Sequence, residues 1–150
     1  MASPRAFFQV LKLHQLVHAA LEQALVQQDL TPPQYTSLSL IRHHEPITPA
    51  ELSRKLGITA QSTLETVKSL EARSLISRAA IPNNRRSISL YLTDEGRVML
   101  VQADRLVYAA EQAFFGRLKP KDFEHLQDSI RILRSAPVLQ AVDVGESIPG

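Results

Sequence analysis

The sequence contains no cysteine, and this absence excludes disulfide bonds, thiolate metal ligands and a thiol redox switch. It also has no uninterrupted apolar run of roughly 18 residues, the length that marks a membrane-spanning helix. Residues 1–8 lack the charged start, the apolar block and the cleavage site of an export signal. These absences together lead us to expect a cytoplasmic protein without a membrane partner.

The sequence offers little from which an enzyme site could be built. It has no glycine-rich phosphate loop and no nucleophile elbow, and its Ser, His and Asp residues follow no catalytic spacing. His14 and His18 lie four residues apart, and His43 and His44 are adjacent. Because no cysteine accompanies them, packing in an interface is the favoured role of His14 and His18. We expect no enzyme activity, no metal and no cofactor.

The charge of the chain is unevenly distributed. The net charge of its 150 residues is +2, but residues 42–86 carry eight Lys or Arg and only four acids. That middle segment is therefore +4, and the remainder is −2. A basic middle between slightly acidic ends fits a polyanion-binding surface and fits a chance fluctuation equally well.

The first expected element is a helix from Ser3-Pro4 to about residue 28, with Ser as its cap and Pro in its first turn. Two apolar stripes run along it, one starting at Phe7 and the other at Val10. A surface helix needs only one apolar stripe. A terminal helix that is apolar on two sides therefore predicts a subunit interface.

Three shorter helices are expected next. Pro46 ends the first, and the second begins with a capping box that includes Glu51 and stops at Gly57. The third runs to about Arg73. Their predicted caps are Thr31, Thr48 and Thr59.

A β-hairpin is expected after these helices, with strands at 76–81 and 87–92 and a turn at 82–86. Alternation in the second strand predicts inward Ile88, Leu90 and Leu92 and outward Ser87, Ser89 and Tyr91.

Two helices are expected after the hairpin. A long helix should run from about 94 to 118, and a last helix should start at Pro120 and weaken at Pro137. A loose tail is expected after about residue 141.

The order helix, glycine turn, helix and hairpin is that of a winged helix-turn-helix, spanning about residues 48–92. Leu52 and Leu56 should pack on Val67 and Leu70 and so fix the angle of the second helix. Its opposite face is polar and would fit the major groove of B-DNA, while arginines at the hairpin tip suit the electronegative minor groove. The expected DNA contacts are Thr48, Thr59, Gln61, Ser62, Thr63, Leu64, Glu65, Lys68, Ser69, Arg73, Asn84, Arg85 and Arg86.

The chain resembles the MarR family, named for the multiple antibiotic resistance regulator. The matching stretches are LTPPQYTSLSLI, ITPAELSRKLGITAQSTLETVKSLEARSLISR and NNRRSISLYLTDEG, and the helix order matches over about residues 6–137. The resemblance implies one mainly α-helical domain over residues 1–150, with dimerisation helices at about 4–28 and 94–137. It places the winged helix-turn-helix, with its small β-hairpin wing, at about 32–92.

The resemblance also implies a homodimer that binds double-stranded DNA. The helix from Thr59 would enter the major groove and Arg86 the minor groove of a pseudo-palindromic operator, with half-sites about one turn apart. The residues expected in the dimer interface are Phe7, Leu11, Leu21, Phe123, Leu126, Ile130 and Leu133.

Three residues depart from the family pattern. Asn84 stands where the family usually has an Asp that orients the wing arginine, which would leave the wing less rigidly held. Glu65 puts a carboxylate near phosphates, which weakens binding unless it accepts a hydrogen bond from cytosine N4. Leu64 either contacts a thymine methyl or adds to the core, and the sequence leaves both open.

A small-molecule effector is a further implication of the resemblance. Such regulators are often repressors released by an aromatic or phenolic acid, bound between the dimer helices and the DNA-binding lobe. His14, Arg42 or His43 could pair with a carboxylate, although a plain core or surface role is the favoured interpretation of each. The candidate ligand contacts are Phe7, Phe8, Leu11, His14, His18, Tyr35, Arg42, His43 and Tyr108.

One alternative class stays open beside the DNA-binding regulator. It is a winged-helix module that binds protein partners without specific DNA binding, and Glu65 and Asn84 favour it. Replacing Arg86 with Ala separates the two classes, because only the first predicts a loss of DNA affinity.

Overall fold

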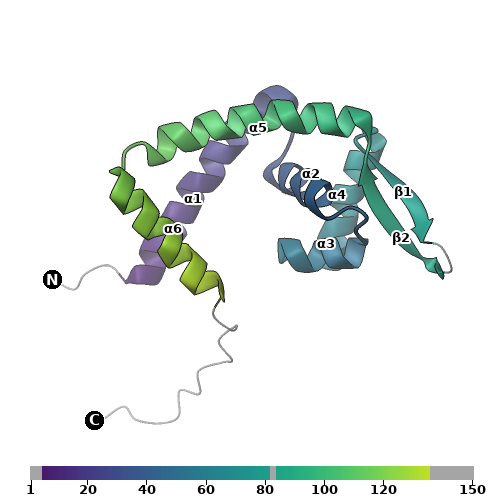
Figure 1. Ribbon diagram of the computed structural model, residues 1–150, viewed down its shortest axis with the longest axis horizontal. Coiled ribbons are helices and arrows are strands. Elements are labelled where there is room, and N and C mark those ends of the chain that lie inside the picture. The colour runs from purple at the N-terminus through teal and green to yellow at the C-terminus, as the bar shows by residue number, and fades with distance from the viewer. Residues whose placement is uncertain (1–4, 82–83, 136–150) are drawn as a thin grey trace, which may run out of the picture. The chain divides into compact units, whose positions relative to one another are not determined.

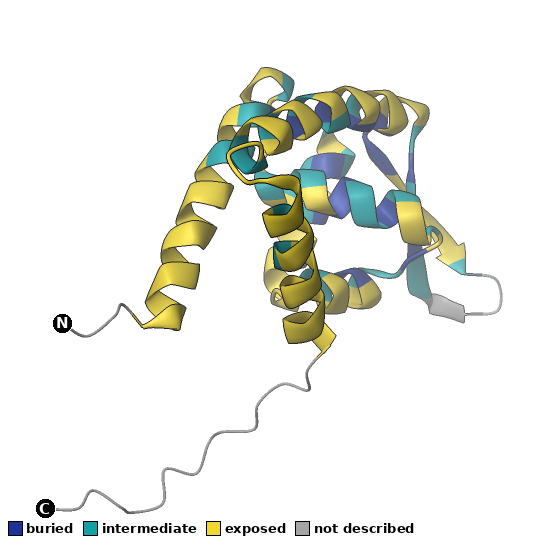
Figure 2. Cartoon of the chain, turned by 60° about the vertical axis from the view of Figure 1, so that its left-hand side comes forward, coloured by how far each residue is buried: buried dark blue, intermediate teal, exposed yellow. Residues whose placement is uncertain are grey.

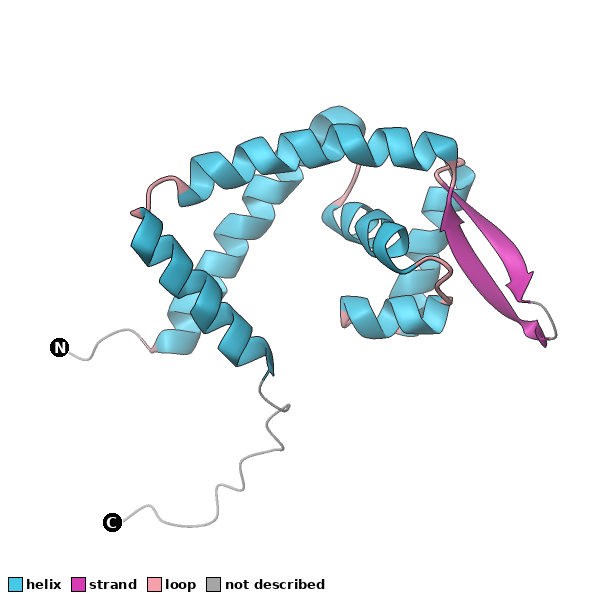
Figure 3. Ribbon diagram, in the orientation of Figure 1, coloured by secondary structure: helices cyan, strands magenta, loops and turns pink. Residues whose placement is uncertain are grey.

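The computed structural model describes residues 5–81 and 84–135, and the side chains at 84–86 are not described. The chain is mainly α-helical with one two-stranded hairpin, as the sequence predicts (Figures 1 and 3). The first helix begins at Ala6 with the extended Arg5 as its N-cap, so the expected start at Ser3-Pro4 is wrong. Ser3, Pro4 and the expected tail themselves lie outside the described residues. The elements are α1 (Ala6–Leu25), the short 3-10 helix η1 (Val26–Gln28), α2 (Pro32–His44), α3 (Pro49–Leu56), α4 (Ala60–Ala72), β1 (Ile76–Ile81), β2 (Asn84–Leu92), α5 (Asp94–Phe115) and α6 (Pro120–Ser135).

The chain divides into two compact units, one ending at Phe114 and the other starting at Phe115. The first unit holds α1 to α4, the hairpin and nearly all of α5. The second holds α6, where the ring centroids of Phe115 and Phe123 lie 5.2 Å apart. Within the described ranges, no helix is long and apolar enough to cross a membrane.

Local hydrogen bonds determine where the short helices begin. Thr31 Oγ1 accepts a hydrogen bond from the N–H of Gln34 at 3.3 Å, and Gln34 Oε1 accepts one from the N–H of Thr31 at 2.9 Å. Thr48 and Glu51 exchange the same pair of bonds at 3.2 and 2.9 Å. These capping boxes satisfy N–H groups that a helix start would otherwise leave unpaired. The third predicted cap, at Thr59, is confirmed as well.

The hairpin is longer than predicted. β2 begins at Asn84 and not at residue 87, because Asn84 pairs with Ile81 across a register irregularity at the end of β1. Ala80 pairs with Ile88 and the next residue, Ile81, pairs with Asn84, so residues 85–87 of β2 have no partner in the described β1 at this step, an irregularity larger than a one-residue bulge. The turn is therefore shorter than the predicted 82–86, and Arg85 and Arg86 belong to β2.

Burial along β2 follows the predicted alternation only in part. Leu90 and Leu92 are buried, as expected for inward-facing residues. Ser89 is expected to face outward but is also buried, and Ile88 is expected to face inward but is only partly buried. The N–H of Leu90 donates to the carbonyl of Ile47 at 2.7 Å, which ties the hairpin to the connection between α2 and α3.

The core of the first unit fixes the position of α4 (dark blue segments in Figure 2). Leu52 of α3 and Val67 and Leu70 of α4 are fully buried, as the predicted packing requires, and Leu56 packs at the edge of the cluster. A fully buried aliphatic side chain of this size contributes about 1.5–3 kcal/mol. The other buried members are Leu25, Leu30, Leu38, Ile41, Ile47, Leu75, Ile76, Leu90, Leu92, Leu100, Ala103 and Val107.

α1 leaves most of its predicted apolar stripes in solvent. Leu25 is its buried residue, whereas Phe7 and Leu11 are 82% and 62% exposed, and Figure 2 shows the helix exposed along most of its length. Leu21, which is expected in the dimer interface, packs partly against the chain's own core. Contiguous exposed apolar surface marks an interaction site.

The start of α5 depends on a close approach of two backbone segments. The N–H of Gly96 donates to Thr93 Oγ1 at 2.9 Å, and the N–H of Thr93 donates to the Leu75 carbonyl at 3.1 Å. A Cβ atom on Gly96 would lie 2.0 Å from that carbonyl oxygen. The glycine is therefore required by packing against the chain that enters β1.

Replacing Gly96 with Ala is expected to lower the free energy of unfolding by about 3 kcal/mol, the upper range for overpacking, because neither backbone can move without breaking the Thr93 bonds. Chemical denaturation measures the loss.

Gly57→Ala is the matched control. Gly57 has a φ of 67°, but nothing lies within 4 Å of an added Cβ. Gly57→Ala should lower the free energy of unfolding by only about 1–2 kcal/mol, the penalty for a residue with a side chain in the left-handed region. Equal losses for the two variants would contradict the close approach at Gly96.

Candidate DNA interface

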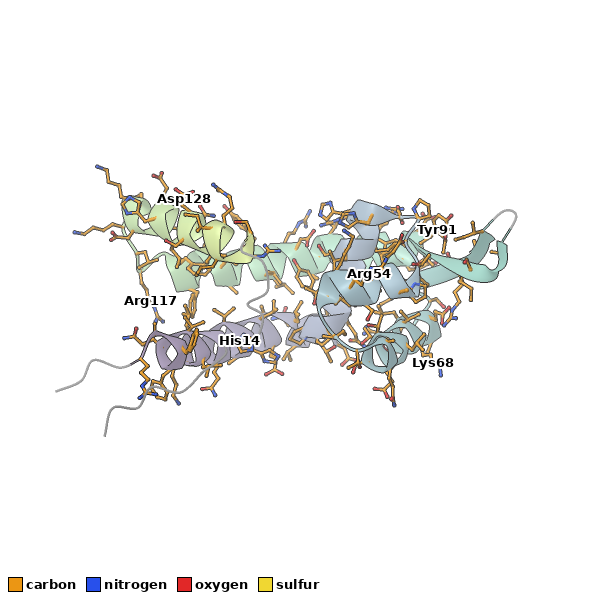
Figure 4. All side chains as sticks on the ribbon, turned by 90° about the horizontal axis from the view of Figure 1, so that it is seen from below. His14, Arg54, Lys68, Tyr91, Arg117 and Asp128 are labelled. Carbon is orange, nitrogen blue, oxygen red and sulfur yellow. The ribbon has the colours of Figure 1, made fainter. Side chains whose placement is uncertain are left out.

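α4 presents one polar face to solvent. Gln61, Glu65 and Lys68 follow at steps of four and three, which places them on one side of the helix, and all three are exposed. Val67 and Leu70 lie on the opposite side and are fully buried. Figure 4 shows Lys68 pointing away from the ribbon. The same helix thus fills the core with one face and offers the other to a partner.

Leu64 adds an apolar group to this exposed face. Its side chain is 41% exposed, so the alternative that it serves only as extra core is wrong. An exposed leucine beside Gln61 and Glu65 is placed to contact an apolar group such as a thymine methyl.

The N-terminus of α4 carries two exposed hydroxyl groups. Thr59 Oγ1 accepts from the N–H of Ser62 at 3.1 Å and donates to Ser62 Oγ at 2.9 Å. The positive end of a helix dipole favours an anion at this point. Thr48 caps α3 in a similar way but is partly buried.

Two residues expected to contact DNA are turned inward. Thr63 is 1% exposed and its hydroxyl donates to the Thr59 carbonyl at 3.0 Å, so it is removed from the candidate contacts. Ser69 is half-buried, accepts from Gln34 Nε2 at 3.0 Å and donates to the Thr66 carbonyl at 2.7 Å. Its hydroxyl therefore joins α4 to α2.

Arg73 is also engaged within the chain. Its Nη1 donates to the Asp29 carbonyl at 2.5 Å, and its Nη2 donates to the Gln28 carbonyl at 3.1 Å. The expectation that Arg73 holds the DNA backbone is not supported, because both ends of its guanidinium bind the segment that follows η1.

Internal ion pairs use further cations of the basic middle segment. Arg78 of β1 pairs with Glu71 of α4, and Arg42 of α2 pairs with Asp104 of α5 at 2.7 Å. The bond to Glu71 raises the pKa of Arg78, against the opposing effect of burial. These charges hold the fold together and are not available to a polyanion.

Two exposed cations of the winged region, Arg54 and Lys55, were not among the DNA contacts expected from the sequence. Arg54 and Lys55 of α3 are exposed, and neither makes a hydrogen bond or ion pair within the described chain. Leu52 and Leu56 face the core, so helical spacing between them already directs residues 54 and 55 outward. Figure 4 shows Arg54 on α3, in the same unit as Lys68.

Glu51 lies on the same short helix as these cations. The backbone N–H of Thr48 chiefly lowers the pKa of Glu51, and the charges of Arg54 and Lys55 lower it further. Glu51 is thus an anion held at the helix start, where it partly offsets the local positive charge.

The base of the wing is anchored through Glu45. Glu45 Oε2 accepts from the N–H of Leu92 at 2.9 Å, and Glu45 Oε1 pairs with Arg97. Burial acts to raise the pKa of Glu45, but the bonds from Arg97 and Leu92 outweigh it and lower that pKa. Asn84, Arg85 and Arg86 stand in β2, and their side chains lie outside the described part of the chain.

Two candidate ligand residues converge on one carboxylate. The Tyr35 hydroxyl donates to Asp104 Oδ1 at 2.9 Å, and Arg42 Nη1 bonds Oδ2 at 2.7 Å. Burial and the Asp104 carboxylate raise the pKa of Tyr35, and Glu111 adds to this effect. The cluster ties α2 to α5 and occupies the guanidinium that a ligand would need.

The remaining ligand candidates are exposed to solvent. His14 and His18 have ring centroids 6.1 Å apart, and His18 Nδ1 lies 3.7 Å from Glu22 Oε1 on the exposed side of α1. Across residues 5–81 and 84–135, no group of three His, Cys, Asp or Glu could hold a metal ion. The exposed candidates are Phe7, Phe8, Leu11, His14, His18, His43 and Tyr108.

The MarR family model matches residues 30–88, which run from the start of α2 into β2. The HTH-type transcriptional regulator YdcH of Bacillus subtilis is 30% identical over 104 residues, which cover 67% of this chain and 71% of the relative. The HTH-type transcriptional repressor Rv2887 of Mycobacterium tuberculosis is 26% identical over 110 residues, which cover 71% of this chain and 79% of the relative.

Solved structures share the fold. The transcriptional repressor CouR bound to a 23-mer DNA duplex superposes with a TM-score of 0.78 at 26% identity, over 89% of this chain and 99% of that chain. The complex of Rv2887 with salicylic acid gives a TM-score of 0.72 at 23% identity, over 88% and 97% of the two chains.

Glu45→Gln is expected to destabilise the protein at neutral pH by about 1–2 kcal/mol, because a neutral amide loses the charge-assisted bonds to Arg97 and Leu92. The lowered pKa means that this contribution is complete above the unfolded value of about 4.3 and disappears as the pH falls through the folded value. The free energies of unfolding of the variant and of wild type, measured by chemical denaturation from pH 7 to pH 3, should therefore become equal at the acid end.

Glu65→Gln is the control for this series, since it removes an exposed carboxylate of α4 that does not bind the base of the wing. A gap between Glu45→Gln and wild type that stayed constant across the pH range would contradict the ionic role of Glu45.

Proposed function

The chain belongs to the MarR family of transcriptional regulators, and from this premise we propose that it is a cytoplasmic repressor whose dimer binds a pseudo-palindromic operator. The observation that carries this proposal is the exposed face of α4, with Gln61, Glu65 and Lys68 in line and the opposite face fully buried. A helix held in this way enters the major groove as a rigid reader.

Base contacts would come from the exposed face of α4. The Gln61 amide can pair with adenine through two hydrogen bonds, and the Glu65 carboxylate can accept from cytosine N4. Leu64, 41% exposed beside them, suits a thymine methyl. These three side chains would set the sequence preference.

Phosphate contacts would come from cations that have no hydrogen-bond or ion-pair partner within the described chain. Lys68 lies on the contact face of α4, and Arg54 and Lys55 lie on the outer side of α3. Each phosphate contact releases counterions, so these residues would set the salt dependence of binding. Arg85 and Arg86 of the wing would reach the adjacent minor groove.

The dimer would form through apolar surface that the single chain leaves exposed. On α1, Phe7 and Leu11 are 82% and 62% exposed, and on α6, Ile130 and Leu133 are 43% and 72% exposed. Phe123 and Leu126 of α6 are half-buried. A two-fold dimer presents two copies of α4, which requires an operator of matching symmetry.

A small aromatic acid would release the repressor from its operator. The solved relative Rv2887 holds salicylic acid, and this chain places Arg42 and Tyr35 at one carboxylate, Asp104. An acidic ligand that used Arg42 would have to compete with Asp104, so ligand binding and the tie between α2 and α5 would be coupled.

A protein-binding winged helix is the second candidate function. The exposed carboxylate of Glu65 and the exposed Leu64 favour it, because both features also suit a protein surface. The two candidates differ in whether duplex DNA is bound specifically.

Wild-type protein is expected to shift DNA from upstream of its own gene saturably, in the presence of excess non-specific competitor. Arg86→Ala should weaken this binding by about 1–3 kcal/mol, which is roughly 5- to 150-fold, because alanine cannot reach into the minor groove. Mobility-shift titration measures both quantities.

Arg105→Ala serves as the control, since it removes an exposed arginine of α5. It should bind as wild type does. Unchanged binding by Arg86→Ala, or no saturable binding by wild type, would support the protein-binding alternative.

Sedimentation equilibrium is expected to give twice the chain mass for wild type. Leu11→Glu should shift the protein toward the monomer, because it places a charge in the proposed interface. Val98→Glu, which changes an exposed valine at the start of α5, should remain dimeric. A monomeric wild type, or a Leu11→Glu dimer of wild-type affinity, would rule out this interface.

A further inference from the structure

Arg73 joins the C-terminal end of α4 to the end of the α1–η1 segment. It is the C-cap residue of α4, and its guanidinium binds two successive carbonyls, those of Gln28 and Asp29. Asp29 caps η1 in the left-handed region, with φ of 51° and ψ of 41°. The contact therefore bridges residues 44 and 45 positions apart in the sequence.

The chemistry of this contact suits arginine in particular. The last carbonyls of a helix lack N–H partners and carry the negative end of the helix dipole. A planar guanidinium presents several N–H donors in a fixed fork, so Arg73 can hold both carbonyls at once with a defined direction. A lysine would supply the charge but not the fork.

Other polar contacts of α4 lead to different elements. Ser69 accepts from Gln34 of α2 at 3.0 Å, and Glu71 pairs with Arg78 of β1. Among the side-chain hydrogen bonds of the described α4 segment, that of Arg73 reaches the end of η1. Arg73 follows the exposed Lys68 by five residues, about 1.4 helical turns, and caps the helix that carries the contact face.

We propose that Arg73 is a positioning residue, which sets the direction of α4 relative to α1 and does not itself contact DNA. The inference rests on the proposed function. If two chains join through α1, the tie at Arg73 sets how far apart the two copies of α4 stand. It therefore sets how strictly the protein requires one spacing between operator half-sites.

Two substitutions at Arg73 test this role. Arg73→Met removes every donor and keeps an unbranched stem, while Arg73→Lys keeps the charge and removes the fork. Binding is measured to the operator and to two versions with one base pair inserted or deleted between the half-sites, each at several salt concentrations.

Arg73→Met should lose roughly tenfold in affinity for the native operator and discriminate less between the three spacings. Its slope of log affinity against log salt should equal that of wild type, because the variant neutralises as many phosphates as wild type does. Arg73→Lys should discriminate between the three spacings less than wild type does and more than Arg73→Met does.

Lys68→Met is the matched control, since it removes an exposed cation from the same helix. It should lower the magnitude of the salt slope by about 0.9 for each phosphate that Lys68 neutralises and keep the wild-type preference for spacing. The melting temperature and the dimer mass of each variant show whether it is folded. If Arg73→Met does not fold, the spacing preference and salt slope of Arg73→Lys are compared with those of wild type instead.

A reduced salt slope with an unchanged spacing preference in the Arg73 variants would overturn the inference and make Arg73 a phosphate-binding residue. Wild-type affinity and spacing preference in those variants would overturn it too. Absence of specific binding by the wild-type protein would overturn the proposed function, and this inference with it.

Discussion

Helix α4 must bury one face and expose the other, and the packing around it follows from this requirement. Val67 and Leu70 are fully buried against the core, and the same helix carries Gln61 and Lys68 into solvent. Because one rigid helix serves both purposes, the core fixes the direction of the polar side chains. A change in packing under α4 is therefore also a change in the surface it presents.

Fewer cations of the winged region are available to a partner than its composition suggests. Arg42, Arg73 and Arg78 all bind partners within the chain, where they join α2 to α5, α4 to the end of η1, and β1 to α4. The described cations left for a polyanion are on α3 and on the outer side of α4, and Arg54 and Lys68 are examples. Charge in this region thus has two separate uses, namely positioning of α4 and binding of a partner.

Features set by near neighbours could be predicted from the sequence, and features set by distant partners could not. The cap at Thr48 depends on Glu51 three residues away, so its pattern is readable. Polarity suggests exposure at Thr63, yet its hydroxyl bonds back to the preceding turn and leaves the residue free to be buried. The carbonyls that hold Arg73 lie 44 and 45 residues away, and no local pattern indicates them. The early start of β2 depends on pairing with β1.

Photo-crosslinking shows whether the exposed face of α4 reads the major groove. A photoreactive residue is placed at Glu65 of α4 and, in a second protein, at Val101 of α5, which is 48% exposed. With the upstream DNA bound, we expect crosslinks from position 65 to bases in both half-sites and none from position 101. Crosslinks from position 101 alone, or from neither position while the DNA is bound, would contradict this role of α4.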